Sequence, residues 1–162
     1  MSETVTAAIA LGANLPGPAG TPADSVREAI GLLDGVEGVR VTDRSSLHIT
    51  EPVGPPGQPD YVNACVLIHT GLGPRALLYA MLQIERGLGR DRLVEERWGP
   101  RTVDLDLLTH GSHTLDSEGL TLPHPRMHER RFVLAPLAEI APDLIVPRLE
   151  RSVGDLLALL DA

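Results

Sequence analysis

The chain has 162 residues, 43% of them hydrophobic and 22% charged, which is typical of a single globular domain with a substantial core. Its net charge of −8 disfavours binding to nucleic acid or anionic membranes, and it lacks the run of about 18 apolar residues that a transmembrane helix needs. The single cysteine excludes an internal disulfide, and no basic region precedes the apolar N-terminal run as in a signal peptide. We therefore expect one cytoplasmic domain over residues 1–162.

The start of the chain predicts a buried strand followed by a helix. Residues 4–11 are apolar enough for the strand, and a loop rich in glycine and proline follows over residues 12–22. Thr21 and Pro22 are typical of the N-cap and the first position of a helix, and Gly35 is typical of its end.

Three further strands and a second helix are predicted in the middle of the chain. Residues 38–50 are expected to form one strand, and residues 61–69 form the next after a proline-rich loop over 51–60. Pro74 begins a helix whose apolar residues recur at helical spacing, and residues 102–109 form another strand.

This order of elements predicts the fold class. Strand, helix, strand, strand, helix, strand is the split βαβ arrangement of an α+β, ferredoxin-like βαββαβ sandwich. Beyond it we expect a small hairpin near residues 110–122, a helix over 128–140 and a C-terminal helix over 152–160.

The basic residues narrow the possible chemistry. All 14 are arginine, so the chain has no lysine. A P-loop, a protein kinase and a Schiff-base enzyme each need a lysine, and all three classes are excluded. If the protein handles phosphate, arginines and a metal ion must do so.

Two aspartates on the strand over 102–109 predict a metal–nucleotide site. Asp104 and Asp106 are two residues apart, so they share one face of the strand, while the alternating apolar residues point the other way, into a core. Carboxylates with substrate phosphates are the usual ligands of Mg²⁺, and arginine binds phosphate as a bidentate fork. Four arginines precede this strand, at Arg90, Arg92, Arg97 and Arg101.

Four ordered segments resemble the 6-hydroxymethyl-7,8-dihydropterin pyrophosphokinases of folate synthesis. They are LGAN at 11–14, QPDYVNA at 58–64, ERWGPRTVDLDLL at 96–108 and PHPRMHERRFVLAPL at 123–137. The resemblance implies transfer of a pyrophosphoryl group from ATP to the hydroxymethyl oxygen of the pterin, with release of AMP.

The resemblance also implies roles for residues on the ATP side. Asp104 and Asp106 would hold two Mg²⁺ ions between the ATP phosphates, and Arg90 and Arg101 would be catalytic, stabilising charge on the transferring group. The other ATP contacts that it implies are Glu85, Arg92, Arg97, Leu107 through its backbone, His124 and Arg130.

On the pterin side, the resemblance implies that Tyr61 and Phe132 sandwich the bicyclic ring. Asn63 can both donate and accept hydrogen bonds, which suits an aminopyrimidinone edge. Thr50 and Val53 would complete this recognition through their backbone groups, and Trp98 would lie on a closing loop.

Other functions remain open on the sequence alone. A non-catalytic sensor on the same fold would bind Mg²⁺ and ATP without transfer, and a metal-dependent phosphohydrolase would use the same two aspartates. An RNA-binding module would need exposed aromatics and a basic face, which this acidic chain with 2% aromatic residues lacks. We expect a monomer whose partners are the two small substrates, with no nucleic acid or membrane.

Overall fold

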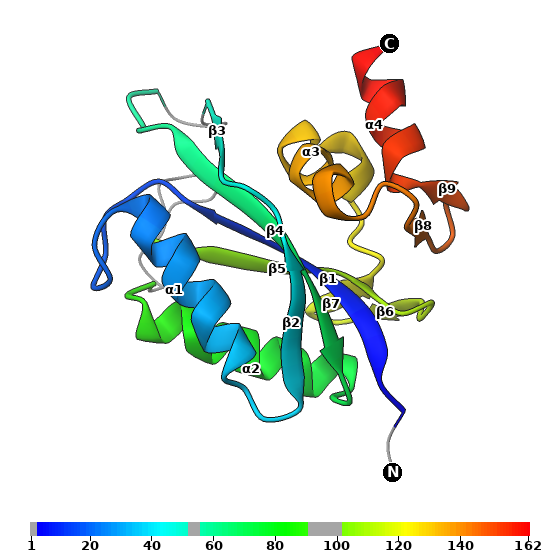
Figure 1. The fold of residues 1–162 in the computed structure, drawn as a ribbon, viewed down its shortest axis with the longest axis horizontal. Coiled ribbons are helices and arrows are strands. Elements are labelled where there is room, and N and C mark those ends of the chain that lie inside the picture. Colours follow the sequence, from blue (N-terminus) through cyan, green and yellow to red (C-terminus); the bar gives the residue numbers. More distant parts are fainter. Residues whose placement is uncertain (1–2, 52–55, 91–101) are drawn as a thin grey trace.

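An antiparallel β-sheet with helices on both faces forms the frame of the fold (Figure 1). The computed structural model describes residues 3–51, 56–90 and 102–162. Within these ranges the elements are β1 (Val5–Ala13), α1 (Pro22–Asp34), β2 (Val39–Arg44), β3 (His48–Thr50), β4 (Tyr61–Thr70), α2 (Pro74–Gly87), β5 (Asp104–His110), β6 (Leu115–Ser117), β7 (Leu120–Leu122), the 3₁₀ turn η1 (Met127–Glu129), α3 (Arg131–Ile140), β8 (Ile145–Val146), β9 (Arg151–Ser152) and α4 (Val153–Asp161).

The strand order in the sheet is β2-β4-β1-β5, and β3 pairs with the beginning of β4. Every pair of neighbouring strands is antiparallel. The register places Gly12 of β1 opposite Asn63 of β4 and Asp104 of β5, and it places Ala10 opposite Cys65 and Asp106. Residues in one such row project from the same face, so the two aspartates and Asn63 share a face.

The predicted start of the first helix is confirmed. The side chain of Thr21 accepts a hydrogen bond from the backbone N of Asp24 at 3.1 Å, and the Asp24 carboxylate accepts one from the backbone N of Thr21 at 2.9 Å. This reciprocal capping box satisfies two N–H groups that have no partner within the helix. Gly35 caps the end of α1, as predicted.

The prediction of one strand over residues 38–50 is wrong, because the structure divides it into β2 and β3. The backbone N of Ser45 donates to the Cys65 carbonyl at 2.9 Å, but the backbone N of Cys65 donates to the Ser45 hydroxyl, also at 2.9 Å. A side-chain oxygen thus replaces a backbone carbonyl, and the regular ladder is interrupted.

The C-terminal part differs from the prediction in two further details. The helix expected over 128–140 is divided into η1 and α3, and the short hairpin of β8 and β9 before α4 was not predicted. No helix in the described part of the chain is long and apolar enough to cross a membrane.

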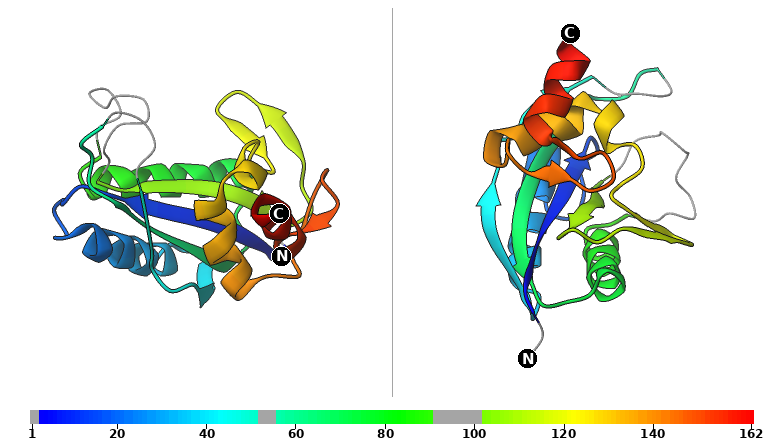
Figure 2. Two further views of the ribbon diagram at one scale, coloured as in Figure 1. Left: turned by 90° about the horizontal axis from the view of Figure 1, so that it is seen from above. Right: turned by 90° about the vertical axis from the view of Figure 1, so that its right-hand side faces the viewer.

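Alternate residues of the strands contribute to two separate cores. Ile9 of β1 and Leu105 of β5 pack with the apolar sides of α1 and α2. Ala8 and Leu108 belong to a second cluster, formed with α3 and α4. Figures 1 and 2 show the two pairs of helices on opposite sides of the sheet. Asn63, Asp104 and Asp106 project from the face that carries α3.

Candidate active site

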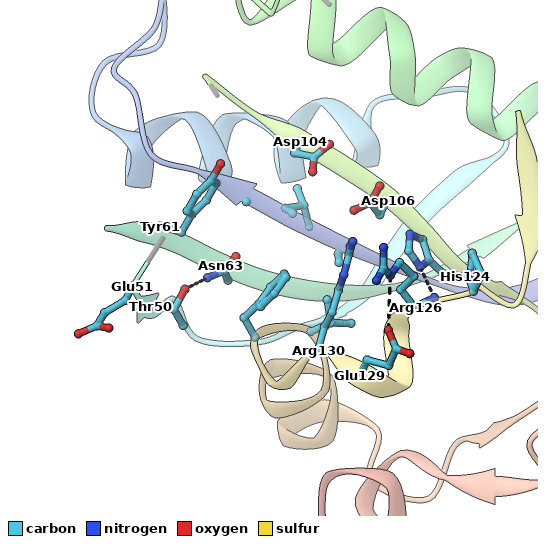
Figure 3. Close-up of a pocket in the computed structure, with 16 residues that line it drawn as sticks. Thr50, Glu51, Tyr61, Asn63, Asp104, Asp106, His124, Arg126, Glu129 and Arg130 are labelled. Atoms are coloured by element: carbon cyan, nitrogen blue, oxygen red, sulfur yellow. Dashed lines mark hydrogen bonds and ion pairs between the residues drawn. The ribbon is translucent and has the colours of Figure 1, made fainter. Parts of the chain in front are cut away.

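A cavity of about 620 Å³ lies between α3 and the sheet (Figure 3). This volume is typical of a site for small-molecule ligands. Residues of β1, β4 and β5 line its floor, and the segment from His124 to Val133 lines its side. Half of the predicted site residues line it, namely Thr50, Tyr61, Asn63, Asp104, Asp106, His124, Arg130 and Phe132.

The other predicted residues are divided into two groups. The first group is buried and is not among the described residues that line this cavity; it consists of Glu85, Arg90 and Leu107. Leu107 lies on β5, which is the end strand of the sheet order β2-β4-β1-β5. Its side chain packs in the core with α1 and α2. The remaining five lie outside the described residues: Val53, Arg92, Arg97, Trp98 and Arg101.

The two aspartates face the cavity from neighbouring positions of one strand face (Figure 3). Ala10 and Gly12 lie opposite them on β1, and such small residues leave room above the sheet. Burial and, after it, the charge of Asp104 raise the pKa of Asp106 to about 7. A positive ion between the two carboxylates would relieve this repulsion, so the pair favours a cation.

A buried ion-pair network fixes the position of the Asp104 carboxylate. Arg90 Nη1 lies 2.6 Å from Asp104 Oδ1 and 2.9 Å from Glu85 Oε2. The Arg90 and Glu85 side chains are 2% and 3% exposed, whereas that of Asp104 is 27% exposed. Glu85 Oε2 also accepts a hydrogen bond from the Leu105 backbone N at 2.8 Å, which fastens α2 to β5. Arg90 therefore orients one of the two carboxylates that face the cavity.

His124 is positioned by its backbone and by one ring nitrogen. Its backbone N donates to the Leu108 carbonyl at 2.8 Å, and its Nδ1 accepts from the Arg126 backbone N at 3.2 Å. Burial and, to a smaller extent, Arg130 lower the pKa of His124 to about 4, so the ring is neutral at pH 7. Because Nδ1 is the acceptor, the proton lies on Nε2, which can donate to an anionic oxygen.

Arg130 connects the acidic and the aromatic parts of the cavity. Its guanidinium carbon lies 5.7 Å from the centre of the Phe132 ring, a cation–π contact. Figure 3 shows the Arg130 side chain extending toward Asp106. Its charge lowers the pKa of Asp106, against the larger effects of burial and Asp104. Arg130 can therefore contact an anion that lies against the acidic pair.

Thr50, Tyr61 and Asn63 lie at the end of the cavity away from His124 (Figure 3). Asn63 is 5% exposed, and its Nδ2 donates to Thr50 Oγ1 at 2.6 Å, which fixes the orientation of the amide. A Cβ atom on Gly12 would approach Asn63 Oδ1 to 3.1 Å, so glycine leaves the space that this amide occupies. The cavity thus combines an end that holds an acidic pair, a histidine and an arginine with an end lined by a tyrosine and a buried amide.

Several lining residues were missed by the sequence reasoning. Glu51, Arg126 and Glu129 also line the cavity, and Arg126 Nε lies 3.4 Å from Glu129 Oε2. The position of Arg126, two residues after His124, was the available signal. Within the described ranges, no group of three or more His, Cys, Asp or Glu side chains could hold a metal ion.

The family model for 7,8-dihydro-6-hydroxymethylpterin-pyrophosphokinase matches residues 8–142. The chain belongs to this family. A 2-amino-4-hydroxy-6-hydroxymethyldihydropteridine pyrophosphokinase from Synechocystis is 44% identical over 155 residues, which are 96% of this chain and 76% of the relative. The enzyme of the same description from Bacillus subtilis is 48% identical over 132 residues, covering 82% of this chain and 75% of the relative.

Solved structures support the same fold. The Plasmodium falciparum HPPK-DHPS crystal structure with pteroate has a TM-score of 0.71 and 13% sequence identity over 98% of this chain. This chain spans only 43% of that longer protein, and at such identity the likeness concerns the fold alone. Family membership makes the chain an enzyme, a pyrophosphokinase of folate synthesis with ATP as a co-substrate.

Proposed function

We propose that the cavity holds ATP and 6-hydroxymethyl-7,8-dihydropterin side by side, and that the pyrophosphoryl group passes between them with release of AMP. One observation carries this proposal: the acidic pair and the amide of Asn63 line the same cavity of about 620 Å³. The ATP phosphates would lie at Asp104 and Asp106, and the pterin would lie between Tyr61 and Phe132 with its edge toward Asn63.

Asp104 and Asp106 fit a magnesium site. Both are oxygen ligands on one strand face, and burial and, after it, the charge of Asp104 raise the pKa of Asp106, two effects that a bound cation would oppose. We propose two Mg²⁺ ions, with phosphate oxygens and water completing the coordination. Bound Mg²⁺ would withdraw charge from the phosphates and lower the pKa of the attacking alcohol.

The protein side chains would mainly position the phosphates and balance their charge, as in other phosphoryl-type transfers. His124 would donate from Nε2, and Arg130 would contact a phosphate beside Asp106. Arg90 and Arg101 are proposed to stabilise charge on the transferring group and on departing AMP, Arg90 from its place against Asp104. Further ATP contacts are proposed for Glu85, Arg92, Arg97 and the Leu107 backbone.

The pterin would stack between Tyr61 and Phe132. Stacking a base-like ring on an aromatic side chain contributes about 1–3 kcal/mol in nucleic-acid complexes, and a pterin is comparable. The Asn63 amide would bind the aminopyrimidinone edge, with Thr50 holding its orientation. Val53 and Trp98 are proposed to complete this end.

We further propose that the chain is a cytoplasmic monomer with one ferredoxin-like domain. The strand order β2-β4-β1-β5 supports the ferredoxin-like description. The net charge of −8 supports the expectation that neither nucleic acid nor membrane is a partner.

The test is an assay of AMP formation from ATP and Mg²⁺ with and without the hydroxymethyl-dihydropterin. We expect AMP and the pterin diphosphate only when the pterin is present. Release of inorganic phosphate without pterin would instead indicate a phosphohydrolase, and ATP binding without turnover would indicate a sensor.

A further inference from the structure

The carboxylate of Glu139, near the end of α3, ties this helix to the segment around β3. Glu139 Oε2 accepts a hydrogen bond from the Ser46 backbone N at 2.7 Å. Glu139 Oε1 accepts from the Ser46 hydroxyl at 2.7 Å and lies 2.9 Å from His48 Nε2. These contacts join segments more than 90 residues apart in the sequence, since Ser46 and Glu139 are 93 residues apart.

The groups on both sides of this contact belong to the pterin end of the cavity. β3 carries Thr50, whose hydroxyl fixes the Asn63 amide, and α3 carries Phe132. We infer that Glu139 is a positioning residue for pterin recognition, because it sets the spacing between β3 and α3 and so between Thr50 and Phe132. This inference rests on the proposed function of the cavity.

A second cavity lies beside this polar contact. A groove of about 390 Å³ lies between β3 and α3, and both Thr50 and Phe132 line it as well as the main cavity. Both residues thus border two hollows, while Phe132 also packs against the apolar cluster of α3 and α4, and Thr50 pairs with Tyr61 of β4. Where two elements leave a groove between them, a polar contact that joins them helps to hold their spacing. Ser46 and His48 line the same groove, where Glu139 holds them.

The Glu139 carboxylate is ionised in this contact. Hydrogen bonds from Ser46 and, after them, from His48 lower the pKa of Glu139 to about 2. The carboxylate therefore accepts these hydrogen bonds as an anion at neutral pH. A neutral amide at this position keeps the size of the side chain but replaces one acceptor oxygen with a donor.

We would test Glu139→Gln against Asp161→Asn. Asp161 accepts from Arg131 at 2.8 Å, so the control also removes an exposed carboxylate that contacts α3, but on its α4 side. Calorimetry would give the Kd of a non-hydrolysable ATP analogue with Mg²⁺, and then the Kd of the pterin in its presence. For Glu139→Gln we expect the pterin Kd to rise about three- to tenfold, as for the loss of a charge-assisted hydrogen bond, with the ATP-analogue Kd within about twofold.

Ser46→Ala is the milder variant, because it removes one hydroxyl and keeps the backbone hydrogen bond to Glu139. It should raise the pterin Kd in the same direction but less, and the double variant should show less than the sum of the two effects. The KM for pterin should rise in parallel, while Asp161→Asn should change neither Kd.

Two results would overturn the inference. One is a Glu139→Gln variant whose pterin Kd equals that of the wild type, and the other is an equal loss of pterin and ATP-analogue affinity. A wild-type protein that binds no pterin would overturn the proposed function as well, so the two failures are distinguishable.

Discussion

The two faces of the sheet differ in what alternate residues of the same strands present. Toward α1 and α2, Ile9 and Leu105 are 0% and 3% exposed and belong to a continuous apolar core, which we call the closed face. Toward α3, Ala10, Gly12 and Asp106 line the cavity, and we call this the open face. Successive residues of each strand thus alternate between the closed face and the open face, and residues two apart share a face.

This difference shows how the fold can include a site whose two neighbouring charges lower the stability of the folded state. Two neighbouring carboxylates in a partly buried position oppose folding, since they repel each other and lose hydration. Burial of apolar surface on the closed face provides stabilisation that does not depend on them. Substitutions on the two faces should therefore change different measured quantities.

The largest effect is expected for Asp104→Asn and Asp106→Asn on the open face. Each should lower the rate of AMP formation by about a thousandfold or more, because several kcal/mol of charge stabilisation are lost with the metal. Circular dichroism should show an unchanged fold. Asp116→Asn is the matched control, since Asp116 pairs with Arg148 at the surface. Near wild-type turnover in either site variant would contradict the metal assignment.

Arg90 contacts both Glu85, on a helix of the closed face, and Asp104, on the open face. Arg90→Met should therefore change stability as well as activity. It would leave the buried Glu85 carboxylate without this cation, which should lower the free energy of unfolding by about 3–5 kcal/mol. Urea unfolding measures this change. Arg148→Met removes an exposed pair and should cost at most about 1 kcal/mol. If both variants unfold alike, the network around Glu85 does not stabilise the fold.

The alternation of the strand over 102–109 could be predicted from the sequence, because a strand with apolar residues at every second position has only one way to bury them. The structure confirms that Asp104 and Asp106 share a face. The start of α1 could also be predicted, since Thr21 and Asp24 cap it through contacts three residues apart.

Contacts between distant segments could not be predicted in this way. The break between β2 and β3 depends on Ser45 bonding to Cys65, 20 residues later in the chain. The burial of Arg90 against Glu85 depends on how closely α2 approaches β5. The resemblance gave Arg90 a phosphate contact, which remains a proposal, and it gave no sign of this ion pair.

A pair of substitutions, Ile9→Ala and Phe132→Ala, tests whether the faces are independent. Ile9→Ala should lower the free energy of unfolding by about 2–5 kcal/mol, because it leaves a cavity in the closed-face core. Phe132→Ala should weaken pterin binding by about 1–3 kcal/mol and leave ATP-analogue binding unchanged. Calorimetry on the folded variants measures both ligands. Weaker pterin binding by folded Ile9→Ala would show that the faces are coupled.

The smallest effect is a gain in stability from Asp106→Asn in the metal-free protein. The pKa of Asp106 is raised from its ordinary value of 3.8 to about 7, so between these values the folded state binds more protons than the unfolded state. The wild type should therefore lose stability as pH rises through this range. At pH 8, Asp106→Asn should be more stable than the wild type by on the order of 1–3 kcal/mol, and at pH 4 the difference should nearly vanish.

Asp104→Asn should change stability in the opposite direction, although the two aspartates are neighbours on one face. Asp104 accepts a hydrogen bond from Arg90 at 2.6 Å, so its removal takes a partner from a buried cation. Urea unfolding at pH 8 without metal would compare the two variants, and added Mg²⁺ should raise the stability of the wild type more than that of either. Equal signs for the two substitutions would show that the acidic pair is not divided into one compensated and one uncompensated charge.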